Sequence, residues 1–184
     1  MKNIVLVLLF ACSVSFAQKQ KIILKESSKI EDVAYENDNN EIKANFKRIN
    51  SIKKWSKITT YETDDSTEGG YINYYYLNGK LEKIVERKFG ESGQYLAEYY
   101  LQNNKISFLF EKDMTYNVPF YRKEFDYDKS EIEENRYYFV KNELVNLKSN
   151  LDCGAPFSNY YLEEEQKRVM KDFNDLLKNS KLAK

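Results

Sequence analysis

Three copies of one short pattern set the architecture of this chain: YYYLNGKL at residues 74–81, YYLQNNKI at 99–106 and YYFVKNEL at 137–144. Each copy joins two β-favouring runs through two residues that favour turns. Asn78-Gly79 is the strongest hairpin signal, because a type I′ turn needs positive φ at both central residues. Asn103-Asn104 tolerates the same left-handed conformation, and Lys141-Asn142 is the weakest of the three. The sequence therefore predicts three β-hairpins with two-residue turns.

A two-residue turn also predicts the register of each hairpin, and with it the face on which each side chain lies. Around the second turn, the predicted pairs on one face are Leu101 with Ile106, Tyr99 with Phe108, and Ala97 with Phe110. The equivalent positions of the other two hairpins are Ile72, Tyr76, Leu81, Val85, Phe139 and Leu144. The opposite face carries Glu98, Tyr100, Gln102, Lys105, Ser107 and Glu111, with Leu109 as the one aliphatic exception. We expect an antiparallel sheet with one buried and one solvated face.

The remaining elements complete an α+β fold, in which an antiparallel meander of about seven strands is packed by an N-terminal and a C-terminal amphipathic helix. Residues 56–63 form a further predicted strand, and residues 112–135 form a long insertion. The N-terminal helix is predicted over 41–54 from the spacing of Ile42, Phe46, Ile49, Ile52 and Trp55. The C-terminal helix is predicted to be capped by Ser158 or Asn159, with Leu162, Val169, Phe173, Leu176 and Leu177 on its apolar side.

The composition excludes several classes of function. The 184 residues include 29 Lys and Arg, 29 Asp and Glu, and no histidine. Ser-His-Asp and Cys-His catalysis and histidine-ligated zinc are therefore excluded. Zero net charge argues against a strongly basic nucleic-acid binder. The length predicts a single domain, which we place at residues 41–179, after a polar segment at 18–40 and before a tail at 180–184.

The N-terminus indicates export. Lys2 precedes an apolar run and the ending Ser15-Phe16-Ala17, as in a secretory signal peptide over residues 1–17 that is cleaved after Ala17. The alternative is a lipoprotein anchored at Cys12. After cleavage at Ala17 only Cys153 remains, so no intrachain disulfide is expected. No later segment is long and apolar enough for a membrane helix. We expect a periplasmic or cell-surface protein in which Cys153 is structural and half-buried.

Several motifs resemble one type of exported protein. They are STEGG at residues 66–70, FGESGQ at 89–94, YNVP at 116–119 and DCGAPF at 152–157, together with the repeated Tyr-Tyr hairpins. In these motifs the chain is similar to an uncharacterised family of exported or periplasmic proteins from Bacteroidetes-type bacteria. The likeness covers residues 49–177. It implies a compartment and a fold, and it brings no activity, substrate or cofactor.

The acidic residues suggest two kinds of site, each of which competes with a plain solvated surface. Asp64, Asp65 and Glu68 could supply oxygen ligands to Ca²⁺, although they lack the alternating spacing of an EF-hand loop. The second acidic cluster consists of Asp126, Asp128, Glu131, Glu133 and Glu134. Paired carboxylates could also hydrolyse a glycosidic bond without histidine. We expect neither metal nor cofactor, and no phosphate-binding glycine loop, since the glycine pairs lie between strands.

The sixteen tyrosines are the most suggestive feature. Tyr71, Tyr75, Tyr100 and Tyr138 are predicted on the face opposite the core, where exposed rings could grip a partner. The competing explanation is that tyrosine simply favours pleated, half-buried surfaces. We expect a non-enzymatic binding module that uses this face or the 112–135 insertion to bind a protein, peptide or glycan of the cell envelope. The alternatives are a protein inhibitor or immunity-type partner, and a carboxylate-only hydrolase.

Overall fold

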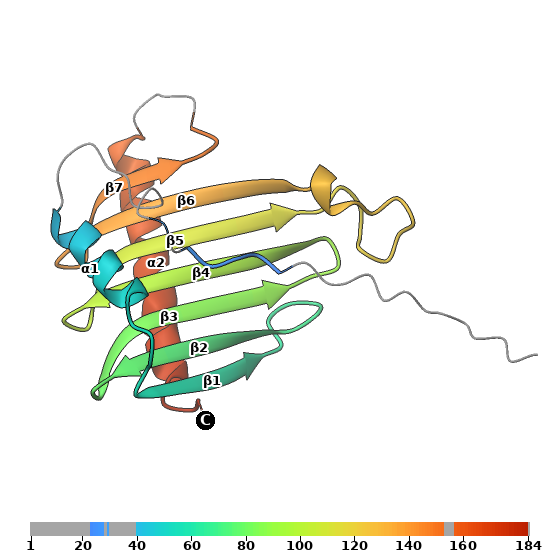
Figure 1. Ribbon diagram of the computed structural model, residues 1–184. Helices are drawn as coiled ribbons and strands as arrows, with labels where there is room; N and C mark the ends of the chain where they lie inside the picture. Colours follow the sequence, from blue (N-terminus) through green and yellow to red (C-terminus); the bar gives the residue numbers. More distant parts are fainter. Residues whose placement is uncertain (1–22, 28, 30–39, 153–156, 184) are drawn as a thin grey trace, which may run out of the picture.

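The computed structural model describes residues 23–27, 29, 40–152 and 157–183. Among them, seven strands form one antiparallel sheet in which spatial order follows chain order, and this confirms the predicted meander (Figure 1). The strands are β1 Lys57–Thr63, β2 Gly70–Leu77, β3 Lys80–Phe89, β4 Gly93–Gln102, β5 Lys105–Thr115, β6 Glu131–Val140 and β7 Glu143–Ser149. The helices are α1 Asn40–Asn50, the 3₁₀ turn η2 Tyr127–Lys129, and α2 Asn159–Asn179.

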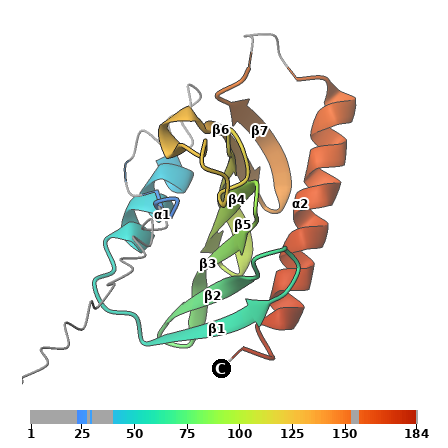
Figure 2. The same cartoon turned by 90° about the vertical axis from the view of Figure 1, so that its right-hand side faces the viewer.

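The two α-helices cover opposite faces of the sheet (Figure 2). We call the side packed by α1 the α1 face and the other side the α2 face. This arrangement confirms the α+β class, but it replaces the predicted solvated face with a second core. The described part of the chain contains no helix that is long and apolar enough to cross a membrane.

The α2 face holds the larger core. Its buried side chains from the sheet are Ile72, Tyr74, Ile84, Ala97, Tyr99, Leu101, Ile106, Leu109, Tyr137, Phe139 and Leu147. Helix α2 adds Val169, Phe173 and Leu176, as its spacing predicts. The hydroxyl of Ser158 accepts a hydrogen bond from the amide of Tyr161 at 3.2 Å, so Ser158 is the predicted N-cap.

All three predicted turns are confirmed. Positive φ angles occur at both central residues of each turn: 50° and 77° at Asn78-Gly79, 52° and 62° at Asn103-Asn104, and 54° and 73° at Lys141-Asn142. Each hairpin, however, contains a register shift three residues after its turn. Tyr75 pairs with Lys83 while Tyr76 pairs with Leu81, so Glu82 is an extra residue. Ser107 and Val145 are extra at the same place in the other two hairpins.

These bulges correct the predicted faces, because one extra residue sends every later side chain of the strand to the other side of the sheet. The pair Leu101 with Ile106 is confirmed, but Tyr99 pairs with Leu109, Tyr100 with Phe108 and Glu98 with Phe110. Val85 belongs to the α1 face, and Leu109 lies in the α2 core. Glu111 also points to the α2 side, where Arg168 of α2 binds its carboxylate at 3.0 Å.

The α1 face has its own aromatic core. Ile42, Phe46 and Ile49 of α1 pack on Tyr100, Phe108, Phe110 and Tyr138 of the sheet. The helix ends at Asn50, four residues before its predicted end at residue 54. Trp55 lies after the helix and contacts Tyr75, with 5.3 Å between the ring centroids. Ile42, Phe46, Ile49 and Trp55 therefore pack on the sheet as predicted, whereas Ile52 joins none of the buried clusters of the described residues.

The insertion between β5 and β6 is shorter than predicted. Residues 112–115 and 131–135 belong to paired strands, with Lys112 opposite Glu134, so the connection spans residues 116–130 only. Glu134 forms ion pairs with Lys112 at 3.6 Å and Arg136 at 2.8 Å. The acidic run that suggested a loop is thus partly neutralised within the sheet. The predicted leader with Cys12, and Cys153, lie outside the described residues.

Candidate functional site

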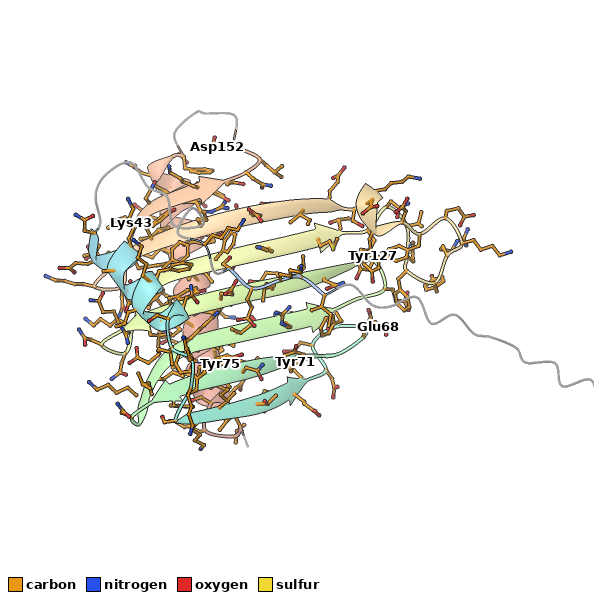
Figure 3. All side chains as sticks on the ribbon, in the orientation of Figure 1. Lys43, Glu68, Tyr71, Tyr75, Tyr127 and Asp152 are labelled. Atoms are coloured by element: carbon orange, nitrogen blue, oxygen red, sulfur yellow. The ribbon has the colours of Figure 1, made fainter. Side chains whose placement is uncertain are left out.

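The four tyrosines of the predicted binding face lie together on the α1 face, but only two of them reach the surface. Tyr100 is 0% exposed and Tyr138 is 1% exposed, because α1 covers them. The prediction that this whole face is solvated is therefore wrong. Tyr71 and Tyr75 are partly exposed on β2 (Figure 3), where Tyr71 contacts Phe89 with 6.0 Å between the ring centroids.

The uncovered part of the α1 face forms an open hollow of about 590 Å³ over β1 to β3. Its lining residues are Thr60, Glu62, Thr63, Asp64, Glu68, Gly69, Gly70, Tyr71, Asn73 and Phe89. The hollow thus brings Tyr71 next to two of the predicted calcium ligands. No group of three acidic or cysteine side chains within the described residues is arranged to hold a metal ion.

The second acidic cluster has structural roles in the described structure. Asp126 caps η2 by accepting a hydrogen bond from the amide of Asp128 at 3.1 Å, and it pairs with Lys129 at 3.6 Å. Glu133 accepts a hydrogen bond from the side-chain amide of Asn135 at 2.8 Å. These carboxylates stabilise local structure instead of converging on one point.

The α1 face also holds a buried charged layer, which the sequence pattern does not predict. The carboxylate of Glu98 is fully buried, and Lys83, with 6% of its side chain exposed, binds it at 2.8 Å. The hydroxyl of Tyr100 donates to the same carboxylate at 2.8 Å. Burial acts to lower the pKa of Lys83, but Glu98, Tyr100 and Glu26 outweigh burial and raise it. Strand alternation already placed Glu98 and Tyr100 on one face, but it could not show that this face is covered.

Residues 23–27, which we call the N-terminal segment, lie across this charged layer on the same side as α1 (Figure 1). We call the side chains beneath it the charged groove: Lys83, Arg87, Gln94, Glu98, Tyr100 and Lys112. Partial burial acts to raise the pKa of Glu26 in the segment, but Lys83 and Arg87 together hold it below its ordinary value. The sequence pattern predicts no role for this segment.

The connection 116–130 projects beyond the ends of the strands (Figure 1). Its base is an aromatic cluster in which Phe125 lies 5.0 Å from Tyr116 and 4.6 Å from Tyr127, measured between ring centroids. Figure 3 shows Tyr127 at this end of the sheet. We call the stretch between Asn117 and Glu124, which a hydrogen bond joins, the tip of this connection. In it, Phe120 is 39% exposed and Tyr121 is 62% exposed, and their ring centroids are 5.9 Å apart. We call residues 116–130 the projecting loop.

Hydrogen bonds hold the projecting loop in one shape. The side-chain amide of Asn117 donates to the carbonyl of Glu124 at 3.0 Å, and the amide of Asp126 donates to Asn117 Oδ1 at 3.1 Å. The amide of Phe120 donates to the carbonyl of Glu91 at 2.9 Å, so the tip is also tied to the neighbouring β3–β4 connection. The two exposed rings are therefore carried on an ordered support.

Buried carboxylates also occur on the α2 face. Burial raises the pKa of Glu86, Lys88 opposes this shift, and Asp172 and Glu111 reinforce it. Glu111 is 5% exposed, and it is held by Arg168 at 3.0 Å and by the hydroxyl of Tyr95 at 2.8 Å. One requirement of a carboxylate-only hydrolase, a carboxyl group with a raised pKa, is present here, although α2 covers this face. The hydrolase hypothesis stays a prediction.

Comparison of the chain with protein-family models, with curated proteins and with solved structures finds no match.

Proposed function

We propose that this protein is an exported, non-enzymatic binding protein, and that it binds a protein partner of the cell envelope through the tip of the projecting loop. The observation that supports this proposal is the pair of exposed rings, Phe120 and Tyr121, at 39% and 62% exposure on an ordered loop. Aromatic side chains supply large contact area and are enriched among the residues that dominate binding energy.

The support of the loop matters as much as its tip. Binding costs less entropy when the contacting side chains are already ordered. The aromatic cluster at the base and the hydrogen bonds of Asn117 provide that order before any partner arrives. The exposed Lys123 follows the two rings, and Arg122 pairs with Glu124 at 3.8 Å, so charges of both signs surround the rings, as in the polar rim of an interface.

A protein inhibitor or immunity-type partner is the second candidate function. The same observation favours it, because a loop that extends past the sheet (Figure 1) has the shape of a wedge that can enter the cleft of another protein. The two candidate functions differ in their effect on the activity of the partner. An inhibitor lowers the activity of an enzyme that it captures, whereas a binding module leaves activity unchanged.

The test is affinity capture of envelope proteins with the tagged mature chain and with the double variant Phe120→Ala, Tyr121→Ala. Loss of two aromatic anchors should weaken capture at least about tenfold. The matched control is Tyr160→Ala, which removes a ring that is 73% exposed at the start of α2. Equal capture by the double variant and the wild-type chain overturns the proposal. If an enzyme is captured, its activity with and without the added protein then distinguishes an inhibitor from a binding module.

A further inference from the structure

We infer that the charged groove is a binding site for an extended peptide, and that the chain's own N-terminal segment is a displaceable occupant of it. This site adjoins the base of the projecting loop, where Leu24 shares a buried cluster with Tyr116 and Phe125, but it does not include the exposed rings of Phe120 and Tyr121. The inference therefore does not depend on the proposed function. Its basis is the way in which the sheet contacts residues 23–27.

The groove contacts mainly the backbone of the segment. Four hydrogen bonds join segment backbone atoms to groove side chains: Leu24 N to Gln94 Oε1 at 3.3 Å, Leu24 O to Arg87 Nη1 at 2.6 Å, Lys25 O to Lys112 Nζ at 3.3 Å, and Ser27 N to Glu98 Oε1 at 2.6 Å. The carbonyl oxygen of Ser27 also lies 3.2 Å from the hydroxyl oxygen of Tyr100, whose single proton is donated to Glu98. Backbone groups are common to all peptides. The groove therefore suits an extended chain in general.

Two side chains of the segment add selectivity. Leu24 is 8% exposed and packs with Val85, Leu96 and Met114 of the sheet. Glu26 binds Lys83 at 2.8 Å and Arg87 at 3.4 Å. Leu24 and Ser27 are buried against the groove, the partly exposed Glu26 reaches it through its carboxylate, and Ile23 and Lys25 are exposed. The expected ligand has an apolar residue followed, two positions later, by a carboxylate.

The central charges of the groove stay paired without the segment. Lys83 and Tyr100 both bind Glu98 at 2.8 Å, and neither contact involves the segment. When the segment leaves, Glu98 loses the amide of Ser27 but keeps both of these partners. Arg87 becomes accessible to water, which solvates a guanidinium well. The groove can therefore remain folded when it is empty.

The segment is also an imperfect occupant. Ser27 is 4% exposed, and its hydroxyl oxygen has no hydrogen-bond partner among the described residues. A buried hydroxyl without a partner weakens association. A peptide with alanine at this position avoids that cost and can compete with the attached segment. The attachment itself counts against such a peptide, because a tethered ligand acts at an effective concentration on the order of millimolar.

The test uses the full mature chain and a fluorescein-labelled peptide with the sequence of residues 22–29. The variant Leu24→Asp, Glu26→Lys places a charge in the apolar contact and a cation beside Lys83 and Arg87, so it should release the attached segment. We expect the peptide to bind this variant at least about tenfold more tightly than the wild-type chain, measured by fluorescence anisotropy. A peptide with alanine in place of Ser27 should bind more tightly still.

The matched control is Ile23→Asp, Lys25→Glu, which changes two outward-facing residues of the same segment. It should bind the peptide as weakly as the wild-type chain does. Equal binding by all three proteins overturns the inference, as does loss of the folded circular dichroism spectrum in the releasing variant. A second measurement needs no variant: in the wild-type chain, the amides of Leu24 and Ser27 should exchange with deuterium by local opening. If these two amides exchange only when the whole protein unfolds, the segment is a fixed part of the core and the inference is overturned.

Discussion

At the scale of single residues, the buried pair of Lys83 and Glu98 should be sensitive to substitution. Its two charged atoms are 2.8 Å apart beneath α1 and the N-terminal segment, and Glu98 is fully buried. Changing Lys83 to Met should destabilise the protein by about 3–5 kcal/mol, because it leaves a buried carboxylate without its cation. Urea unfolding measures this loss. Lys80→Met, on an exposed lysine of the same strand, is the control, and a loss below about 1 kcal/mol for Lys83→Met contradicts the expectation.

The raised pKa of Glu86 predicts that the stability of the protein depends on pH. The pKa of Glu86 in the folded protein is raised above the ordinary 4.5, first by burial, with Lys88 opposing the shift and Asp172 and Glu111 adding to it. The buried carboxylate therefore costs stability above the folded pKa, and the cost disappears below pH 4.5, where both states are protonated. Glu86→Gln should raise the melting temperature at pH 8, and the gain should shrink at pH 4. No gain at pH 8 would count against this account.

At the scale of elements, the three turns form a natural series. Lys141-Asn142 adopts φ angles of 54° and 73° with the least suitable residues, and the amide oxygen of Asn142 is buried without a partner among the described residues. Lys141→Asn with Asn142→Gly reproduces the first turn and should stabilise the protein by about 1 kcal/mol, since left-handed conformations suit Asn and Gly. The midpoint of urea unfolding reports the gain. The reverse exchange, Asn78→Lys with Gly79→Asn, should cost a similar amount, and a neutral result for both pairs rejects the explanation.

At the scale of the whole molecule, one sheet serves two cores, so the two sides should unfold together. Trp55, the single tryptophan, packs on the α1 side, whereas Phe173 is buried on the α2 side. Phe173→Ala should destabilise the protein by about 3–5 kcal/mol. Because unfolding of a single domain is cooperative, the tryptophan fluorescence transition should shift by as much as the circular dichroism transition. A fluorescence transition that stays in place shows that the two cores unfold separately.

Much of the fold could be predicted because it depends on local chemistry. The turns at Asn78, Asn103 and Lys141 need only residues that accept positive φ, and short turns make neighbouring strands pair in chain order. The helices needed only apolar side chains at helical spacing and a capping Ser158. Neighbours in sequence carry all of this information.

The candidate sites could not be predicted to the same extent, because they depend on contacts between distant residues. Tyr100 and Glu98 are ordinary surface residues by alternation alone. They are buried because Phe46 and the N-terminal segment, which contacts them across 71 to 73 residues of sequence, lie over them. The bulges at Glu82, Ser107 and Val145 then assign later side chains to one core or the other. Turn chemistry acts within a few residues, so the sequence alone determines the hairpins and their order. Burial is a property of the assembled surface, and only the packed structure decides which face is open to a partner.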